Sequence, residues 1–460
     1  MTSSFPSPVD VIILAAGKGT RMRSVVPKVL HPLAGIPLAQ HVIRAAQALE
    51  PRSVQVVYGH GGEQLPTVLG VQQVAWVLQA EQKGTGHAVQ QAMPAVAAGS
   101  IVLVLYGDVP LIRPDTLRPL LGAAGRGALA LLSVELEDPA GYGRILRDPA
   151  GAVTGIVEQK DASPDQNRIR EVNTGILAAD AGRLRNWLSA LQADNAQGEY
   201  YLTDIVAMAA AEGVPIEAMH PKAVWEVMGV NSRSQLAELE RIAQRNLASG
   251  LMEHGVTLMD PGRFDLRGDL TAGRDVVIDV NVVIEGRVTL GDGVQIGPNN
   301  VLRDCAIGAG TVVQPNCVIE ESTIAEGARI GPFARIRPGS RIAAHAHIGN
   351  FVEIKKSDVG EASKVNHLSY IGDSTVGRDV NIGAGTITAN YDGANKHRTV
   401  IGDNASIGSD CTLVAPVSVG AGATIGANTT ITEDVPPGVL AVGRVRQKII
   451  EGWKRPAKKP

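Results

Sequence analysis

A six-residue period in the C-terminal part of the sequence limits the possible folds more than any other feature. Aliphatic–glycine pairs recur after about residue 275, and the last four begin at residues 401, 407, 419 and 425, all separated by multiples of six. Such a period is typical of one short strand and one turn, with the aliphatic side chain pointing inward once per repeat. Three repeats close a triangular coil, and stacked coils form a parallel β-helix. The pairs are Leu290-Gly291, Ile296-Gly297, Ile330-Gly331, Ile348-Gly349, Val376-Gly377, Ile382-Gly383, Ile401-Gly402, Ile407-Gly408, Val419-Gly420 and Ile425-Gly426.

The composition agrees with this architecture. The chain has 460 residues and 52 glycines, yet 44% of its residues are hydrophobic and only 3% are aromatic. Glycine supplies turns, and a narrow coil accommodates aliphatic side chains better than rings. The register slips between Ile371 and Val376, and residues 386–398 show no repeat. We therefore expect residues 386–398 to leave the stacked coils as a loop that has a functional role.

The first half of the chain has a different pattern, in which apolar runs alternate with amphipathic stretches. Apolar, β-branched runs separated by helices indicate a mostly parallel α/β sheet that is buried on both faces. In such a sheet the ligand binds beyond the carboxyl ends of the strands. The predicted strands lie at 9–17, 54–60, 101–108, 128–136 and 175–179, with predicted helices at 36–50 and 84–97.

A connecting helix is predicted at 232–254, because leucine and isoleucine recur there at roughly helical spacing between charged residues. An additional helix of the first domain is an equally good interpretation. We expect a first domain at 1–231, a helical linker at 232–254 and a β-helix domain at 255–460. This division agrees with the two or three domains that follow from about 100–200 residues per domain.

Charge, apolar runs and cysteines exclude several classes of protein. The 43 basic and 46 acidic side chains give a net charge of -3, which argues against a dedicated nucleic-acid binder. The longest apolar runs are far shorter than the ~20 residues that cross a bilayer, and the residues near Met1 do not resemble a signal peptide. Three cysteines without CxxC spacing rule out a disulfide framework and a four-cysteine zinc site. We therefore expect a cytoplasmic protein with no nucleic-acid or membrane partner.

A glycine-rich segment, LAAGKGTRM at 14–22, directly follows the first predicted strand. Gly17 and Gly19 allow backbone N–H groups to approach phosphate oxygens. Lys18, Arg21 and Lys28 supply positive charge nearby. The segment has neither the GK[ST] ending of a Walker A loop nor the third glycine of a dinucleotide fingerprint. It therefore predicts a phosphate cradle, with a tight turn carrying solvated basic residues as the alternative.

Polar residues elsewhere in the first half suit the rest of a nucleotide-sugar site. Asp108 ends a predicted strand, where a carboxylate can hold Mg²⁺ at the ligand edge of the sheet; a helix N-cap is the alternative role. Gln79 offers an amide to the edge of a base and is followed by a flexible turn at 84–85. Taken one at a time, an ordinary turn or surface loop would explain these residues equally well. Groups suited to sugar hydroxyls occur at Gly143, Glu158 and Asn173.

The strand, the LAAGKGTRM segment and Pro27-Lys28 together resemble the sugar-1-phosphate nucleotidyltransferase family over the whole first half. With the hexapeptide half added, the chain resembles the bacterial family of bifunctional N-acetylglucosamine-1-phosphate uridylyltransferases and glucosamine-1-phosphate acetyltransferases. The resemblance implies a Rossmann-like nucleotidyltransferase domain that uses UTP, with Asp108 and Asn231 as Mg²⁺ ligands. It assigns nucleotide and sugar binding to Leu14, Ala15, Ala16, Gly17, Lys28, Gln79, Gly84, Thr85, Tyr106, Gly107, Asp108, Gly143, Glu158, Asn173 and Asn231.

Polar segments at 335–340, 350–357, 363–373 and 389–393 interrupt the aliphatic coils of the second half. His367 is the candidate base there, because imidazole titrates near neutrality and can accept a proton from an amine that attacks a thioester. A histidine that only satisfies a coil turn is the alternative. The side chains available to bind a sugar phosphate or to form hydrogen bonds are Arg337, Lys355, Tyr370, Asn381, Asn390 and Tyr391.

For this half the resemblance implies an N-acetyltransferase with a left-handed β-helix. It also implies a homotrimer whose acetyl-transfer sites lie between subunits. His367 would be the proton acceptor, and glucosamine-1-phosphate would be bound by Arg337, Lys355, Tyr370 and Asn381. Acetyl-CoA would be contacted by Ala384, Asn390, Tyr391, Ser409, Ala427 and Arg444.

The joint hypothesis is two consecutive reactions, acetylation by the second half and then uridylyl transfer by the first. The product would be UDP-N-acetylglucosamine, a precursor of cell-envelope polysaccharides in this family. The alternative is a single-activity sugar-1-phosphate nucleotidyltransferase with a regulatory or trimerising β-helix. The ordered polar cluster around His367 argues against that alternative.

Overall fold

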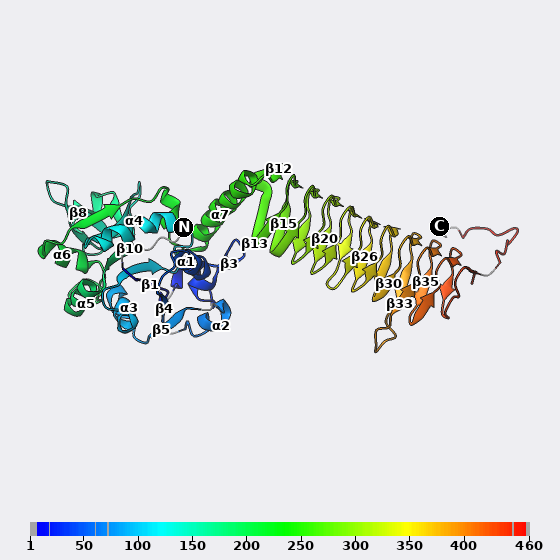
Figure 1. Cartoon of the computed structure of the whole chain (residues 1–460), viewed down its shortest axis with the longest axis horizontal. Helices are drawn as coiled ribbons and strands as arrows, with labels where there is room; N and C mark the ends of the chain where they lie inside the picture. The colour runs from blue at the N-terminus through cyan, green and yellow to red at the C-terminus, as the bar shows by residue number, and fades with distance from the viewer. Residues whose placement is uncertain (1–6, 18, 60, 71–72, 444–445, 457–460) are drawn as a thin grey trace. The chain divides into compact units, whose positions relative to one another are not determined.

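The computed structural model describes residues 7–17, 19–59, 61–70, 73–443 and 446–456. The chain divides into two compact units, Met1–Ala243 and Gln244–Pro460 (Figure 1). The helix α7 (Arg233–Glu253) occupies the stretch for which a connecting helix was predicted, and it contributes residues to both units. No helix in the described part of the chain is long and apolar enough to cross a membrane.

The first unit is built on a nine-stranded sheet, which confirms the predicted α/β fold. The sheet is mostly parallel, but β10 runs antiparallel to both of its neighbours and β8 and β9 form an antiparallel pair beside it. The strand order is β11 (Ile216–Met219), β7 (Leu129–Glu135), β10 (Glu171–Asp180), β6 (Ile101–Tyr106), β1 (Val9–Leu14), β4 (Ser53–Gly59) and β5 (Ala75–Gln79). The strand β8 (Arg144–Arg147) pairs with β10 and with β9 (Val153–Val157). A separate pair is formed by β2 (Pro32–Leu33) and β3 (Ile36–Pro37).

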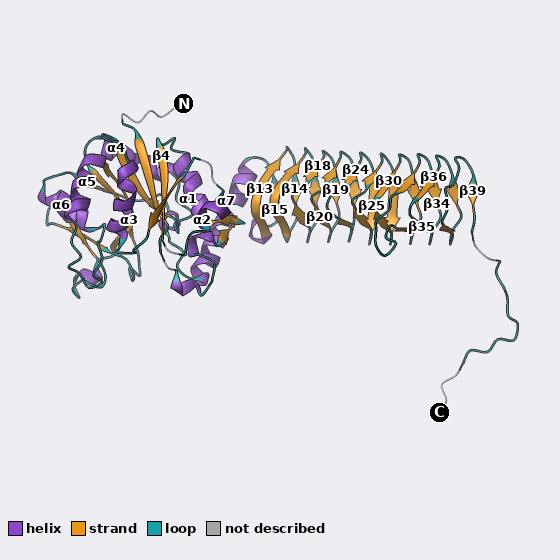
Figure 2. Ribbon diagram, turned by 90° about the horizontal axis from the view of Figure 1, so that it is seen from below, coloured by secondary structure: helices purple, strands orange, loops and turns teal. Residues whose placement is uncertain are grey.

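Helices pack against both faces of this sheet (Figure 2), so its central strands are largely apolar, although Asp10 of β1 and Gln55 of β4 are buried within them. Val11 and Ile13 of β1 belong to one apolar core with α1 and α4, whereas Ile12 belongs to a second core with α3, α5 and α6. Successive side chains of a strand point to opposite faces, and a strand between two helical layers therefore reads as a continuous hydrophobic run. The helices are α1 (Leu38–Gln47), α2 (Leu65–Leu69), α3 (Thr85–Ala92), α4 (Pro114–Gly125), α5 (Ala181–Ala190) and α6 (Asp204–Ala211).

The second unit is a parallel β-helix, as the hexapeptide period predicted (Figure 1). Ile336 is aligned with Ile354, and Ile354 with Ile371, so one coil takes 17 or 18 residues, which is about three hexapeptides. The left-handed sense of the coil stays a prediction that the resemblance carries. One sheet contains β12 (Thr257–Leu258), β14 (Val277–Ile278), β16 (Gln295–Ile296), β19 (Val312–Val313), β22 (Arg329–Ile330), β25 (His347–Asn350), β28 (Lys364–His367), β31 (Asn381–Ile382), β34 (Ser406–Ile407), β37 (Thr424–Ile425) and β39 (Leu440–Ala441).

The other sheet of the β-helix has two short strands per coil over most of its length. Its first two members, β13 (Phe264–Ala272) and β15 (Val282–Leu290), are long strands that span both positions. The remaining strands are β17 (Val301–Arg303), β18 (Ala306–Ile307), β20 (Val318–Glu320), β21 (Thr323–Ile324), β23 (Arg335–Ile336), β24 (Arg341–Ile342), β26 (Glu353–Lys355), β27 (Asp358–Val359), β29 (Tyr370–Gly372), β30 (Ser374–Val376), β32 (Ile387–Ala389), β33 (Thr399–Ile401), β35 (Thr412–Val414), β36 (Val417–Val419) and β38 (Thr430–Ile431).

The aliphatic members of the predicted glycine pairs, from Leu290 to Ile425, are all buried inside the coils. The predicted loop at 386–398 needs one correction, because residues 387–389 form β32 and continue the sheet. The chain leaves the coil only at 390–398, where Tyr391 and Lys396 form an isolated bridge. A strand of three residues without the aliphatic–glycine spacing gave no signal, although its Thr388 is buried in the coil.

Candidate functional site

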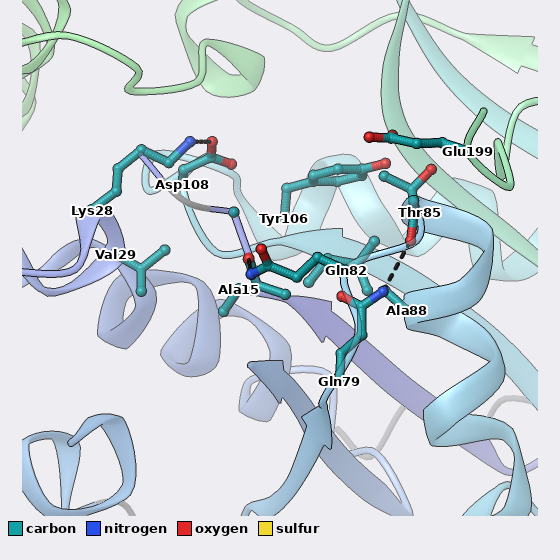
Figure 3. A pocket seen from close by; sticks show the side chains of 14 residues that line it. Ala15, Lys28, Val29, Gln79, Gln82, Thr85, Ala88, Tyr106, Asp108 and Glu199 are labelled. Carbon is teal, nitrogen blue, oxygen red and sulfur yellow. Dashed lines mark hydrogen bonds and ion pairs between the residues drawn. The ribbon is translucent and has the colours of Figure 1, made fainter. Parts of the chain in front are cut away.

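A cavity of about 420 Å³ lies in the first unit at the carboxyl ends of β1, β5 and β6 (Figure 3). This is the edge at which a ligand was expected, because parallel strands leave their last residues and the following loops together there. Val29, Gln82, Ala88 and Glu199 also line the cavity. The predicted residues that line it are Leu14, Ala15, Ala16, Gly17, Lys28, Gln79, Gly84, Thr85, Tyr106 and Asp108.

The turn between β5 and α3 is held in one conformation by its own residues. Gly84 has a φ of 107°, and a Cβ there would lie 2.6 Å from the carbonyl oxygen of Tyr200. Gln79 is 2% exposed, and its Nε2 donates to the carbonyl oxygen of Gly84 at 3.1 Å (Figure 3). The hydroxyl of Thr85 accepts a hydrogen bond from the backbone N–H of Leu202 at 3.1 Å. The turn therefore presents fixed polar groups to the cavity, as recognition of a base requires.

Lys28, Asp108 and Asn231 meet at one side of this cavity. Nζ of Lys28 donates to Oδ2 of Asp108 and, at 2.9 Å, to Oδ1 of Asn231. The side chains of Lys28 and Asp108 are only 10% and 17% exposed. One cation therefore reaches both oxygens, and in this structure that cation is the ammonium group of Lys28.

The same two oxygens fit a divalent metal ion. Carboxylate and amide oxygens are hard donors of the kind that Mg²⁺ prefers, and Mg²⁺ usually takes its other ligands from water and substrate phosphates. Among the described residues, no group of three or more His, Cys, Asp and Glu side chains is placed to hold a metal. A site built on Asp108 and Asn231 therefore needs oxygens from the substrate, and a metal ion there must displace the ammonium of Lys28.

Gly143, Glu158 and Asn173 lie together, where β8, β9 and β10 meet. The backbone N–H of Asn173 donates to the carbonyl oxygen of Gly143 at 2.9 Å, and a Cβ on Gly143 would lie 3.3 Å from Oε1 of Glu158. Burial raises the pKa of Glu158 although the Thr203 hydroxyl donates to its Oε1 at 3.0 Å. Burial also raises the pKa of Tyr106, with a further contribution from the negative charges of Glu158 and Asp108. The phenol of Tyr106 is therefore close to both the predicted sugar-binding and metal-binding groups.

Replacing Glu158 with glutamine is expected to stabilise the protein more at high pH than at low pH. The pKa of Glu158 is higher in the folded than in the unfolded protein, so its contribution to stability is present below the unfolded pKa and is lost as pH rises through the folded pKa. Glutamine has no such ionisation. The difference in unfolding temperature between E158Q and the wild type should therefore be larger at about pH 8 than at about pH 4.

The matched control for E158Q is the exposed Glu212→Gln. A difference in unfolding temperature that is the same at both pH values, or larger at the acidic one, would contradict the prediction. Differential scanning fluorimetry over a pH series measures it directly.

Three residues of the first site carried little or no signal in the sequence. Gln82 donates through Nε2 to the carbonyl oxygen of Ala16 and so links the glycine-rich segment to the turn after β5; its only signal was its position three residues after Gln79. Glu199 lines the cavity from the loop before α6, and Thr203 bonds Glu158 from the start of that helix. Both come from a region of the chain that carried no recognisable motif.

In the second unit, His367 lies at a corner of the β-helix. It ends β28 and is aligned with Asn350 at the end of β25 in the neighbouring coil. Its carbonyl oxygen accepts hydrogen bonds from the hydroxyl of Ser369 at 2.8 Å and from the backbone N–H of Gly385 at 3.2 Å. Its ring is exposed, and Nδ1 lies 2.8 Å from Oδ1 of Asn350. The imidazole is thus presented to solvent on a backbone that is fixed on both sides.

Three of the six predicted acetyl-CoA residues follow His367 along the same corner. Backbone N–H groups of residues 385, 410 and 428 donate to the carbonyl oxygens of residues 367, 384 and 409, respectively. Ala384, Ser409 and Ala427 therefore lie in the three coils that follow His367. Arg444 lies outside the described residues.

Two of the predicted sugar-phosphate residues, Arg337 and Lys355, lie at a different corner. Nζ of Lys355 lies 3.2 Å from Oδ2 of Asp373, and the amide of Asn390 donates to the same oxygen. Nη1 of Arg337 lies 2.7 Å from Oε1 of Glu353. Glu353 and Asp373, which the sequence did not single out, thus hold the basic side chains in place.

The acetyl-transfer residues are therefore divided between two corners within one chain. Leu368 and Asp373 have positive φ angles at the two bends, and β29 with Tyr370 lies between them. Asn381 begins β31 and is aligned with Lys364, on the face that leads to His367. Tyr391 is 60% exposed in the loop 390–398. One chain alone thus places the candidate base and the predicted phosphate-binding cations at opposite ends of a strand.

Comparison with known proteins gives matches over both units. The model of the MobA-like NTP transferase domain matches residues 11–244, and that of the bacterial transferase hexapeptide (six repeats) matches residues 321–356 and 398–433. The bifunctional protein GlmU of Aromatoleum aromaticum is 60% identical over 451 residues, which covers 98% of this chain and 99% of that protein. Proteins of the same name from Ralstonia nicotianae and Azoarcus sp. are 58% and 60% identical over 450 residues, which covers 98% of this chain and 99% and 100% of theirs. Because the identity extends over both units and nearly the full length of these relatives, the chain belongs to the family of the bifunctional protein GlmU.

Proposed function

We propose that the two units catalyse two consecutive steps at the sites described above. The chain is a bifunctional transferase with uridylyltransferase and acetyltransferase activities. The second unit transfers an acetyl group from acetyl-CoA to glucosamine-1-phosphate. The first unit then transfers a uridylyl group from UTP to N-acetylglucosamine-1-phosphate and releases pyrophosphate. The product, UDP-N-acetylglucosamine, is used in cell-wall biosynthesis.

In the first unit, we assign nucleotide binding to the cavity at the ends of β1, β5 and β6. The sugar phosphate attacks the α-phosphorus of UTP in line, and no covalent enzyme intermediate is required, so the residues contribute by positioning and by electrostatic stabilisation. Gly143, Glu158 and Asn173 orient the sugar, and Lys28 neutralises phosphate charge. Mg²⁺ held by Asp108 and Asn231 would supply further positive charge at the phosphates.

In the second unit, we assign the general base to His367. The amine of glucosamine-1-phosphate attacks the thioester carbon of acetyl-CoA, and the imidazole accepts the proton that the amine loses. Lys355 and Arg337 carry the positive charge that suits the phosphate. Tyr370 and Asn381 add hydrogen-bonding groups on the faces between the corners. Acetyl-CoA is assigned to the corner that contains Ala384, Ser409 and Ala427. Its proposed contacts also include Asn390, Tyr391 of the loop 390–398, and Arg444, which lies outside the described residues.

A homotrimer completes this second site in our proposal. The residues for base catalysis and for phosphate binding lie at different corners of one chain, so a neighbouring copy is the natural source of the missing half. The corner next to His367 is also apolar: Phe333, Phe351 and Leu368 are 49%, 55% and 64% exposed. All three have positive φ, which costs non-glycine residues about 1–2 kcal/mol, and the two phenylalanine rings stack at 5.1 Å. Contact with another subunit would bury these rings.

We further propose the domain limits 1–231, 232–254 and 255–460 for uridylyl transfer, linker and acetyl transfer. We place the protein in the cytoplasm, with small molecules rather than nucleic acid or membrane as its partners. Cys305, Cys317 and Cys411 are all buried free thiols, which agrees with a reducing compartment.

The main support for the proposed function is that ten predicted nucleotide-binding residues line one cavity. The chain that contains this cavity is 60% identical to a bifunctional protein. The test is to incubate the purified protein with glucosamine-1-phosphate, acetyl-CoA, UTP and Mg²⁺, and to identify the products while each reagent is omitted in turn. Omitting acetyl-CoA should stop both products, and omitting UTP or Mg²⁺ should stop the sequence at N-acetylglucosamine-1-phosphate. Formation of a UDP-sugar without acetyl-CoA at the same rate would contradict the proposed order.

Replacing Lys28 with methionine is expected to strengthen binding of a divalent cation when no nucleotide is present. In the wild type, a cation must first displace the ammonium from Asp108 and Asn231. Methionine has no charge and similar length, so Mn²⁺, used in place of Mg²⁺, should bind about tenfold more tightly to K28M, equivalent to ~1.4 kcal/mol. Isothermal titration or Mn²⁺ electron paramagnetic resonance measures this affinity.

The matched control is the exposed Lys222→Met, which should leave Mn²⁺ affinity unchanged. Asp108→Asn should weaken Mn²⁺ binding. Equal or weaker Mn²⁺ binding by K28M would show that the ammonium does not compete for this position, and unchanged binding by D108N would show that the metal lies elsewhere.

A further inference from the structure

The side chain of Asn350 contacts the ring of His367 from the neighbouring coil. The strands β25 and β28 are parallel with these two residues aligned, and Oδ1 of Asn350 lies 2.8 Å from Nδ1 of His367. Gly349 allows the coils to approach this closely, since a Cβ there would lie 2.0 Å from the carbonyl oxygen of Asn366. The backbone N–H of Leu368 donates to the carbonyl oxygen of Asn350 at 3.1 Å. The contact is therefore built into the sheet and does not depend on a mobile loop.

The chemistry of this contact decides which ring nitrogen carries the hydrogen. A neutral imidazole has one N–H donor and one nitrogen that accepts. An amide oxygen can only accept, so Nδ1 of His367 must be the donor and Nε2 the acceptor. Among the described residues, none forms a hydrogen bond with Nε2 of His367, and the ring is exposed. The free lone pair is thus on the nitrogen that faces away from the amide.

We propose that Asn350 is a positioning residue for acetyl transfer, whose amide oxygen holds His367 in the tautomer that leaves Nε2 ready to accept the proton of the substrate amine. The inference rests on the proposed role of His367 as the base. From the sequence, Asn350 was only one member of the polar segment 350–357 and had no assigned role. An asparagine suits the position because it fixes the ring without adding a charge.

The proton balance is met with this tautomer. As the amine nitrogen forms its bond to the thioester carbon, the C–S bond breaks and Nε2 of His367 takes the proton that the nitrogen loses. The imidazolium then returns the proton to the departing thiolate, so the products are the N-acetylated sugar phosphate and CoA thiol. Nδ1 keeps its hydrogen throughout and donates it to Asn350 in both the neutral and the charged ring.

His367 has a basic neighbour, so replacing the neutral Asn350 amide with a carboxylate is a useful test. His347, on β25, interacts electrostatically with His367, and burial followed by the charges of Arg329 and Lys364 lowers the pKa of His347. His347 and the two residues whose charges act on it are all basic. A carboxylate in place of the Asn350 amide would therefore change the electrostatics of the ring in the opposite direction.

Two substitutions in the full-length protein test the proposal. Asn350→Leu keeps the approximate volume but cannot accept a hydrogen bond, so kcat for acetyl transfer should fall about 10–100-fold at every pH, less than the ~10²–10⁴-fold that the base itself contributes. Its KM values should change less than about threefold, because the substrate contacts remain. Asn350→Asp keeps the acceptor and adds a negative charge that stabilises the imidazolium. The acidic limb of its kcat profile should therefore move to higher pH, and activity should recover on the alkaline side.

The controls separate this inference from the proposed function. Asn299→Asp makes the same charge change at a coil corner where the amide pairs with Asn281, and it should leave the pH profile unchanged. Uridylyl transfer by each variant verifies that the chain is folded. Acetyl transfer by N350L within twofold of the wild type, or an unmoved profile for N350D, would overturn the positioning role. If His367→Ala itself retains acetyl transfer, the base assignment is wrong and the inference is overturned with it.

Discussion

Replacing His367 with alanine is expected to lower the rate of acetyl transfer by about 10²–10⁴-fold, while uridylyl transfer stays within about twofold. The imidazole is the proposed proton acceptor, and alanine removes it from an exposed position where no core packing is lost. The backbone at this position is fixed by Ser369 and Gly385, so the coil should keep its structure. Both activities are measured on the same preparation, with acetyl-CoA consumption and pyrophosphate release as separate readouts.

A matched control for H367A is His254→Ala, because His254 is an exposed histidine at the end of α7. It should retain both activities within about twofold. If H367A also retains acetyl transfer, His367 is not the base and another group accepts the proton of the amine. A loss of uridylyl transfer in H367A would argue against two independent sites.

Replacing Asp108 with alanine is expected to have the reverse effect, a loss of uridylyl transfer of about 10²–10³-fold or more with acetyl transfer preserved. The substitution removes the carboxylate assigned to the metal ion. It also leaves the nearly buried ammonium of Lys28 with only the neutral Asn231 as a partner. Charge on the transferring phosphoryl group would then be poorly neutralised. Pyrophosphate release at saturating UTP and Mg²⁺ measures the effect.

Asp108→Asn is the second variant, since it keeps the shape of the side chain and should also be inactive in uridylyl transfer. Asp115→Ala removes an exposed carboxylate that pairs with Arg118, and it should leave both rates within about twofold. Acetyl transfer reports whether each variant has folded. Full uridylyl transfer by D108N would show that the carboxylate is not a metal ligand.

The sequence predicted the fold best where the same physical requirement recurs along the chain. In the β-helix, the same inward position recurs in every coil, and only an aliphatic residue satisfies it; Ile330, Ile348 and Ile382 are accordingly buried. In the first unit, a strand covered by helices on both faces is largely apolar, as β1 is, with the buried Asp10 as its one charged residue. Strand β32 was missed because three residues without the aliphatic–glycine spacing carry no period.

Only some residues of the candidate sites could be predicted from the sequence. Residues 14–17 and Asp108 were found because they follow buried strands, where a ligand edge is expected. Gln82, Glu199 and Thr203 are polar residues whose partners lie elsewhere in the chain, such as the carbonyl oxygen of Ala16 for Gln82. Such contacts leave no local pattern, and the same holds for the pairing of Asp373 with Lys355.

Sequence patterns were sufficient to predict the two fold classes, the ligand edge of the first unit and the candidate base of the second, because each depends on residues that are neighbours along the chain or recur at a fixed period. Three features are visible only in the folded chain: Lys28 bonds both predicted metal ligands, Asn350 contacts His367, and the acetyl-transfer residues occupy two corners. Lys28 and Asn231 are separated by 203 positions, and Asn350 and His367 by one coil of 17 residues. Distances of a few ångströms between such residues depend on how strands stack and where turns end, and these are properties of the folded chain as a whole.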